Sequence, residues 1–326
     1  MRVFEVVVTA ASLGLAGCAI QPSVEDTTGL TPYHITAQIR CESRQALRDE
    51  ILRWLTRNPS PKLQAIGEKL QTDPDAFAAF GPATFADPTL VHQKEIVSVF
   101  MNAGVAYDFE LGMSENDDLT AGASFIKPLT NPVTTLGLGG TFKRTRTSTV
   151  AYTNTDTFSS LLKLPANYCS RFVVTENRVY PIAGRIGMDK AIADFVEMTL
   201  FTGMIEKGKT SGPPTMTRAL SFRTEIGISA EPLVTYTPLD AAFQTKSLTL
   251  NAAAGRVDTH KVTVGLAIPS KSAAAVESLR GNILSEGAGR LVVTRTVIGG
   301  GTSAEQLAVL AIDRFKSREV KLVPSQ

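Results

Sequence analysis

Two kinds of hydrophobic spacing follow one another along this chain. Downstream of Ser43, a residue type that favours the start of a helix, apolar residues recur at helical spacing at Leu47, Ile51, Trp54 and Leu55. The pair Asn58-Pro59 ends this pattern. Between residues 105 and 114 apolar and polar residues alternate strictly, with Val105, Tyr107, Phe109, Leu111 and Met113 on one side. This alternation predicts a half-buried antiparallel strand.

Further strands are expected on both sides of a central helix. Asn116-Asp117-Asp118 has turn composition, so the pattern predicts a partner strand over 119–126 and then a hairpin with arms over 135–142 and 147–153. A helix is expected over 187–204. After it, alternation resumes at Leu220, and a second hairpin is expected with arms around Leu248 and Arg256.

The two predicted hairpins resemble each other in position. Leu248 lies 112 residues after Leu136, and Arg256 lies 112 residues after Arg144. This offset indicates either a duplicated module, with domains over 38–180 and 181–326, or a coincidence between two amphipathic hairpins. The C-terminal part adds a helix over 271–284, a strand over 290–297 and a helix over 303–315. The fold class is therefore α+β, with antiparallel β-sheets and flanking helices on one side.

The N-terminus carries a targeting pattern. A basic residue at position 2 precedes an apolar run over 6–16, which is too short to span a bilayer. The run closes on Leu15-Ala16-Gly17-Cys18. These four residues resemble the lipobox of bacterial lipoproteins, and the resemblance implies cleavage after Gly17 and lipidation of Cys18. Residues 1–17 are then a signal peptide, and the polar composition after Cys18 predicts a lipidated N-terminus and flexible stalk over 18–37.

The lipoprotein resemblance also implies a location. The chain would be held by palmitate and other acyl chains on the periplasmic side of a membrane, and Ala19, rather than Asp, after the cysteine favours the outer over the inner membrane. No later stretch approaches 18 uninterrupted apolar residues, so the sequence predicts attachment through lipid alone.

Two cysteines remain after Cys18. Because the periplasm is oxidising, Cys41 and Cys169 are predicted to form a disulfide, with two unpaired buried thiols as the alternative. The formal net charge of +2, the 43% hydrophobic share and the 20% charged share are those of an ordinary globular protein. This balance gives no electrostatic reason to expect a nucleic acid partner.

Residues suited to catalysis or metal binding are scattered. His34, His92 and His260 stand alone in the sequence, and Gly299-Gly300-Gly301 precedes a predicted capping box over 302–305 rather than a phosphate-binding motif. We therefore expect no metal and no cofactor. Arg144 and Arg256, at matching hairpin positions, are candidate anion-binding or lipid-headgroup residues.

These observations predict a function class. We expect a noncatalytic interaction or scaffold component of the cell envelope, with a membrane contact through its lipid anchor and with envelope proteins as partners. Catalysis needs convergent titratable groups, which the sequence does not offer in any recognised motif. A periplasmic hydrolase and a ligand-binding lipoprotein are the alternatives.

Overall fold

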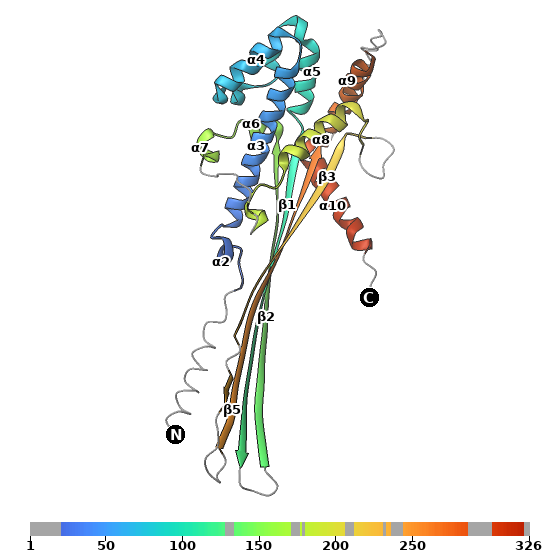
Figure 1. The fold of residues 1–326 in the computed structure, drawn as a ribbon. Coiled ribbons are helices and arrows are strands. Elements are labelled where there is room, and N and C mark those ends of the chain that lie inside the picture. The colour runs from blue at the N-terminus through green and yellow to red at the C-terminus, as the bar shows by residue number, and fades with distance from the viewer. Residues whose placement is uncertain are drawn as a thin grey trace. The chain divides into compact units, whose positions relative to one another are not determined.

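Long antiparallel strands organise the fold. The computed structural model describes residues 21–127, 134–170, 177, 180–205, 212–230, 233–235, 244–285 and 302–322. Its long strands, drawn in Figure 1, form a sheet of order β2-β1-β5-β3. The short β4 pairs antiparallel with β5. The strands are β1 (Gly104–Lys127), β2 (Thr134–Thr157), β3 (Thr215–Ala230), β4 (Leu233–Thr235) and β5 (Gln244–Ala267). Together with the helices they confirm the predicted α+β class.

The strands are longer than the sequence predicted. The expected turn at Asn116-Asp117-Asp118 is wrong, because β1 runs through it, and β2 and β5 likewise run through both arms of the two expected hairpins. The polar residues that suggested a turn are used across strands instead. The Asn116 side chain accepts a hydrogen bond of 2.8 Å from Thr145, and Asp117 accepts from Arg144. Cross-strand pairs of this kind stabilise a continuous sheet.

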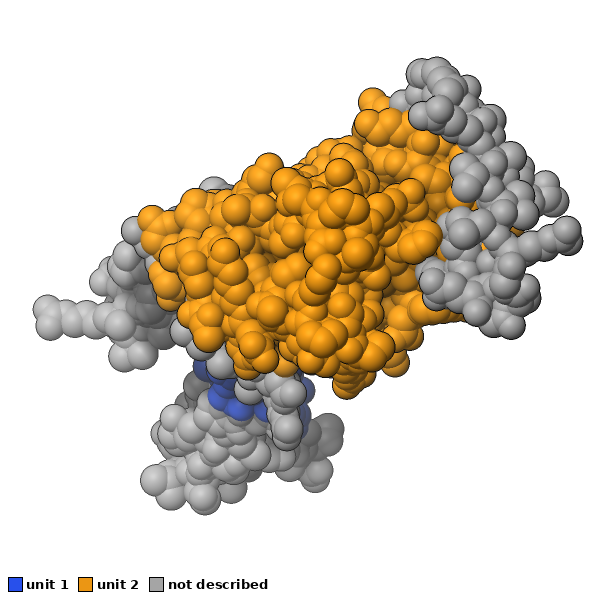
Figure 2. All heavy atoms as spheres, turned by 90° about the horizontal axis from the view of Figure 1, so that it is seen from above, with its two compact units in different colours: residues 1–29, 111–150, 223–259 blue, residues 30–110, 151–222, 260–326 orange. Residues whose placement is uncertain are grey.

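The chain forms two compact units, drawn in different colours in Figure 2. Unit 1 comprises residues 1–29, 111–150 and 223–259, and unit 2 comprises residues 30–110, 151–222 and 260–326. Each unit takes residues from both halves of the chain, so the predicted domain boundary between residues 180 and 181 does not separate the two units. Val105 and Leu220, which fall in different predicted modules, lie in β1 and β3 of one sheet. Duplication of the two halves stays a prediction.

Unit 2 carries most of the helices. Unit 1 has α2 (Glu25–Thr28). Those of unit 2 are α3 (Pro32–Arg57), α4 (Pro61–Thr72), α5 (Val91–Phe100), α6 (Phe158–Leu162), α7 (Ala166–Cys169), α8 (Met188–Phe201), α9 (Ala273–Ser285) and α10 (Ala304–Leu322). The proline-rich segment between α4 and α5 folds into the short 3₁₀ helices η1 (Pro74–Ala79), η2 (Pro82–Phe85) and η3 (Pro88–Leu90). Two further 3₁₀ turns are η4 (Pro181–Ala183) and η5 (Ser270–Ser272). Within the described ranges, no helix combines the length with the hydropathy that a membrane span needs.

Helix α3 begins earlier than predicted. The Thr31 side chain accepts a hydrogen bond from the backbone N–H of His34, and Pro32 occupies the first turn, where a missing N–H costs nothing. Ser43 is therefore not a cap. It lies buried inside the helix and donates to the Ile39 carbonyl. The predicted stalk over 18–37 is wrong at its end, since Ile35 is fully buried in this helix.

Helices cover the sheet of unit 2 on both faces, which corrects the expectation of one side. Phe109 stacks on Tyr152, whose hydroxyl bonds to the Pro32 carbonyl at the start of α3. The alternate positions of β1 and β5 contribute small residues, and Ala106 and Ala267 form a buried cluster with Ala308 and Ile312 of α10. The backbone of α10 comes so close at Gly104 and Gly265 that an added Cβ would collide with it. Small side chains on this face admit a second helical layer.

A disulfide joins α3 to α7. Cys41 and Cys169 are bonded, with their Cα atoms 5.5 Å apart and 128 residues between them in sequence. This confirms the predicted pairing. Next to it, the Arg40 guanidinium binds both carboxylate oxygens of the buried Asp156, at 2.7 and 2.8 Å. The Asp156 carboxylate raises the pKa of Arg40, so the pair stays charged.

Candidate functional site

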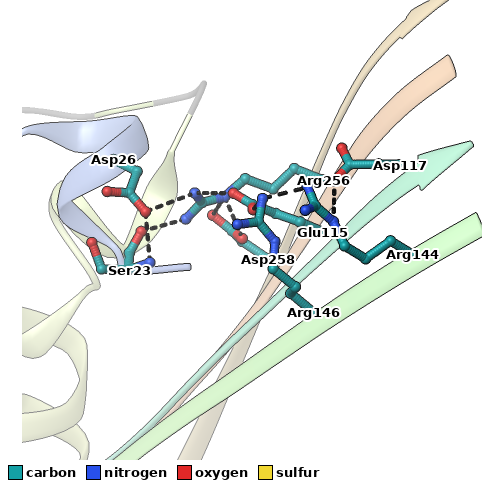
Figure 3. Close-up of polar contacts among 8 residues, drawn as sticks. All are labelled: Ser23, Asp26, Glu115, Asp117, Arg144, Arg146, Arg256 and Asp258. Atoms are coloured by element: carbon teal, nitrogen blue, oxygen red, sulfur yellow. Dashed lines mark hydrogen bonds and ion pairs between the residues drawn. The ribbon is translucent and has the colours of Figure 1, made fainter. Parts of the chain in front are cut away.

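The strands of unit 1 bring together a cluster of charged side chains, shown in Figure 3. We call it the charged cluster, and its members are Asp26, Glu115, Asp117, Arg144, Arg146, Arg256 and Asp258. Glu115 and Asp117 come from β1, Arg144 and Arg146 from β2, and Arg256 and Asp258 from β5. Residues two apart on a strand point to the same face, so the three strands place these side chains on one face of the sheet.

Arg256 lies at the centre of the charged cluster. Its Nε contacts both oxygens of Asp258 at 2.9 and 3.0 Å, and its Nη1 donates to Glu115 at 3.2 Å. The same guanidinium donates to the Ser23 carbonyl and lies 3.4 Å from the Asp26 carboxylate. Only 11% of the Arg256 side chain is exposed. Arg256 therefore ties the segment around α2 to β5.

Arg144 and Arg146 complete the charged cluster on β2. Arg144 binds Asp117 through Nε and Nη2, at 3.1 and 2.6 Å. Arg146 binds Glu115 at 2.7 Å and lies 3.8 Å from Asp117. These pairs set the register of β1 against β2, because each arginine faces its carboxylate directly across the two strands.

Both residues predicted to bind an anion, Arg144 and Arg256, have acidic partners within the charged cluster. Three guanidinium groups face four carboxylates, so the cations of Arg144 and Arg256 are balanced by acidic groups of the chain itself. The backbone N–H of Ser23, and then Arg256, hold the pKa of the Asp26 carboxyl below its usual value. The arrangement joins strands to one another and to α2. An anion-binding or headgroup role for Arg144 and Arg256 stays a prediction.

The other residues singled out in the sequence do not converge. His34 bonds to Thr31 at the start of α3, His92 lies 3.9 Å from Glu95 on α5, and His260 lies buried with its Nε2 against the Tyr180 hydroxyl. No group of three metal-ligand side chains occurs among the residues that the structure describes. Cys18, the triglycine and the strand over 290–297 lie outside those residues. The predicted capping box is displaced by one position, with Ser303 and Gln306 exchanging the two hydrogen bonds.

A buried carboxylate of unit 2 has a structural use that the sequence did not reveal. Both oxygens of Glu42, on α3, accept hydrogen bonds from the backbone N–H groups of Ile186, Gly187 and Met188, at 2.9, 2.7 and 2.8 Å. Gly187 is the N-cap and Met188 the first residue of α8, and a negative charge at the start of a helix is stabilising. Glu42 thus serves as a cap for α8 that is supplied by another helix, α3.

Unit 2 also contains an apolar cavity of about 640 Å³. We call it the α3–α8 cavity, since Leu47, Ile51 and Trp54 of α3 face Val196 and Leu200 of α8 across it. Other walls come from α5 and α9. Glu50, Arg53 and Arg57 place charges beside this apolar lining, and burial raises the pKa of Glu50. The helical spacing of apolar residues from Leu47 to Trp54 predicted the face of α3 that forms one wall. The other walls come from segments distant in sequence, and periodicity within one helix does not predict that they meet.

Comparison with known proteins identifies the family. The model of the family described as "Uncharacterised protein y4kA" matches residues 21–282, so the chain belongs to this family. The protein of Sinorhizobium fredii (strain NBRC 101917 / NGR234) named "Uncharacterized protein y4kA" is 30% identical over 274 residues, which cover 81% of this chain and 82% of that protein. The family match includes the five strands of the described residues, the charged cluster and both cysteines of the disulfide.

Proposed function

We propose that this member of the y4kA family is a lipoprotein, anchored through Cys18 on the periplasmic side of a membrane, that binds other envelope proteins and catalyses no reaction. The lipobox residues motivate the anchor. The Cys41–Cys169 disulfide supports an oxidising compartment, since such bonds persist outside the cytosol. Ala19 favours the outer membrane as the location.

One observation carries the binding role. β2 is the last strand in the sheet order, so among the described residues one of its edges has no neighbouring strand. Its first residues, Thr134 to Phe142, contain no charge and no proline. Charges and prolines are the features by which proteins protect exposed edges, and an unprotected edge is suited to pairing with a strand of a partner. We place the partner-binding surface at this edge.

The binding role is tested by site-specific crosslinking in intact cells. A photoactivatable residue replaces Thr141, on the open edge of β2, and in a matched variant it replaces Gln71, an exposed residue of α4. We expect a reproducible set of envelope proteins crosslinked from position 141 and absent from position 71. A chain that is present in the membrane fraction but gives no crosslink at 141 would contradict the proposal.

The anchor is tested separately. Cys18→Ala should abolish incorporation of labelled palmitate and release the chain from the membrane fraction, because the acyl chains supply the attachment. Undiminished label on this variant would contradict lipidation at Cys18. Separation of inner and outer membranes then tests the sorting.

The α3–α8 cavity supports a second candidate, a ligand-binding lipoprotein. Its volume lies in the range of small-molecule sites, and its apolar walls with a few charges fit an amphipathic molecule. Trp54 is the only tryptophan of the chain, so its fluorescence reports occupancy directly. A saturable emission change with a medium-chain fatty acid, lost in Ile96→Glu, would favour this candidate. An unchanged emission would disfavour it.

A further inference from the structure

Unit 1 exposes a row of large apolar side chains. Its members lie on three adjacent strands and are 42–59% exposed: Leu119 on β1, Leu136, Leu138 and Phe142 on β2, and Leu250 on β5. We call this set the apolar face. Soluble proteins expose single apolar residues freely, but a contiguous group of this size marks a surface that contacts something other than water.

Cross-strand contacts place the β1 and β2 members on one side of the sheet. Asp117 pairs with Arg144 and Glu115 with Arg146, so the next position of the same alternation sets Leu119 opposite Phe142. Leu136 and Leu138 follow with the same parity as Phe142. On β5, Arg256 contacts Glu115, and Leu250 has the parity of Arg256. All five members therefore share the face of the charged cluster.

The opposite side of the same strands is polar. Thr120 faces Thr141, Ser114 faces Thr147, and Asn116 bonds to Thr145. Thr249 of β5 donates to the Gly122 carbonyl. The sheet of unit 1 thus separates apolar from hydroxyl-bearing side chains, with Leu119 and Thr120, or Thr141 and Phe142, pointing to opposite sides.

The chain itself limits the distance from the charged cluster, which borders the apolar face, to the lipid anchor. The Ser23 carbonyl is bound by Arg256, on the face that carries Leu119 and Phe142. Cys18 lies five residues before Ser23, and a fully extended chain of that length spans at most about 18 Å. A lipidated Cys18 would therefore hold the bilayer within this distance of the charged cluster.

We propose that the apolar face contacts the acyl chains of the bilayer to which Cys18 anchors the chain. This inference rests on the proposed lipidation. Lipid removes the five apolar side chains from water, and the polar side of the sheet keeps its hydroxyl groups in an aqueous environment. The charged cluster lies where the surface changes from apolar to ion-paired. Arginine side chains are suited to the headgroup level. A strand added to the open edge of β2 would also satisfy backbone groups that acyl chains leave without partners.

Adjacent positions on β2 provide a matched test. Cys18 is lipidated and Cys41 and Cys169 are bonded, so an introduced cysteine is the single free thiol of the chain. Phe142→Cys and Thr141→Cys are each labelled with an environment-sensitive fluorophore in the full lipidated chain. The chains are then reconstituted with phosphatidylethanolamine–phosphatidylglycerol vesicles, with or without nitroxide-labelled acyl chains. One alkylated thiol per chain shows that the disulfide, and with it the fold, is intact.

We expect opposite behaviour at the two positions. The fluorophore at 142 should shift its emission to shorter wavelength and lose most of it to the nitroxide lipids, whereas the fluorophore at 141 should remain sensitive to aqueous iodide. Equal exposure of both positions to iodide on vesicle-bound chains would overturn the inference and leave the anchor intact. Protection of 142 without vesicles, together with crosslinked dimers, would also overturn it, since a second copy would then cover the face. Failure of the proposed anchor is recognised differently, by loss of palmitate label and of vesicle binding.

Discussion

The two units treat the same kind of alternating sequence in opposite ways. In unit 2, Val105, Tyr107 and Phe109 of β1 are fully buried beneath helices, and burial raises the pKa of the Tyr107 hydroxyl. In unit 1, Leu138 and Phe142 of β2 alternate in the same manner, yet they are 59% and 46% exposed. Alternation therefore specifies that a strand has an apolar side. It does not specify whether the chain itself, a partner or lipid covers that side.

The comparison predicts that stability resides mainly in unit 2, and the disulfide gives its largest test. The double variant Cys41→Ser, Cys169→Ser should lose about 4–5 kcal/mol, because a loop of this length restricts the unfolded chain strongly. The melting temperature of unit 2 should fall by about 10–15 °C in calorimetry. An unchanged transition would mean that unit 2 does not depend on this bond.

A pair of phenylalanine variants compares the apolar sides directly. Phe109→Ala should cost about 3–5 kcal/mol, since it removes a buried ring stacked on Tyr152. Phe142→Ala should cost less than about 0.5 kcal/mol in lipid-free solution, because the residue is already 46% exposed. Urea unfolding followed by circular dichroism measures both. Equal losses would show that something covers Phe142 even without lipid.

Ion pairs sharpen the same comparison at a smaller scale. Arg40→Ala leaves the Asp156 carboxylate, 4% exposed, without its cation and should cost about 3 kcal/mol. Arg144→Ala breaks a pair whose side chains are about one third exposed and should cost about 1 kcal/mol or less, with the difference shrinking in high salt. A larger loss of stability for Arg144→Ala than for Arg40→Ala would contradict this comparison. It would mean that the charged cluster contributes more to stability than the buried pair of unit 2.

The smallest effect concerns the pH dependence of the contact at Asp26. Its carboxyl has a lowered pKa in the folded chain, so the contribution is present above the usual value of 3.8 and is lost as pH falls through the folded value. Carboxyl NMR titration, assigned with Asp26→Asn, should give a midpoint below 3.8. Arg256→Gln should move that midpoint upward. A midpoint at or above the usual value would contradict the contact between Asp26 and Arg256, and with it the attachment of α2 to the charged cluster.

The sequence predicted local structure well where the pattern of residues depends only on the element that contains them. The buried side of β1, the helix after Gly187 and the pairing of Cys41 with Cys169 all follow from spacing or from counting thiols. It failed where a polar residue has a partner far away in sequence. Asp117 looked like a turn residue because its partner, Arg144, lies on another strand, and Ser43 looked like a cap although it is buried inside α3.

The charged cluster was only partly foreseeable. Arg144 and Arg256 were found as matching hairpin positions, but the acids that bind them were not, since register between strands is set by the folded sheet. Thr31-Pro32 did carry a readable signal for the start of α3, a capping hydroxyl before a first-turn proline. The polar composition around it favoured a stalk instead.

The disulfide has a consequence for the fate of the chain after proteolysis. The disulfide between Cys41 and Cys169 closes a covalent loop that contains all of β1 and β2. Residues 111–150 of unit 1 therefore lie within this loop. A single cleavage anywhere between the two cysteines yields two fragments that remain linked. Such a nicked chain should migrate as one species without reductant and as two with it, and both pieces would stay together after the cut.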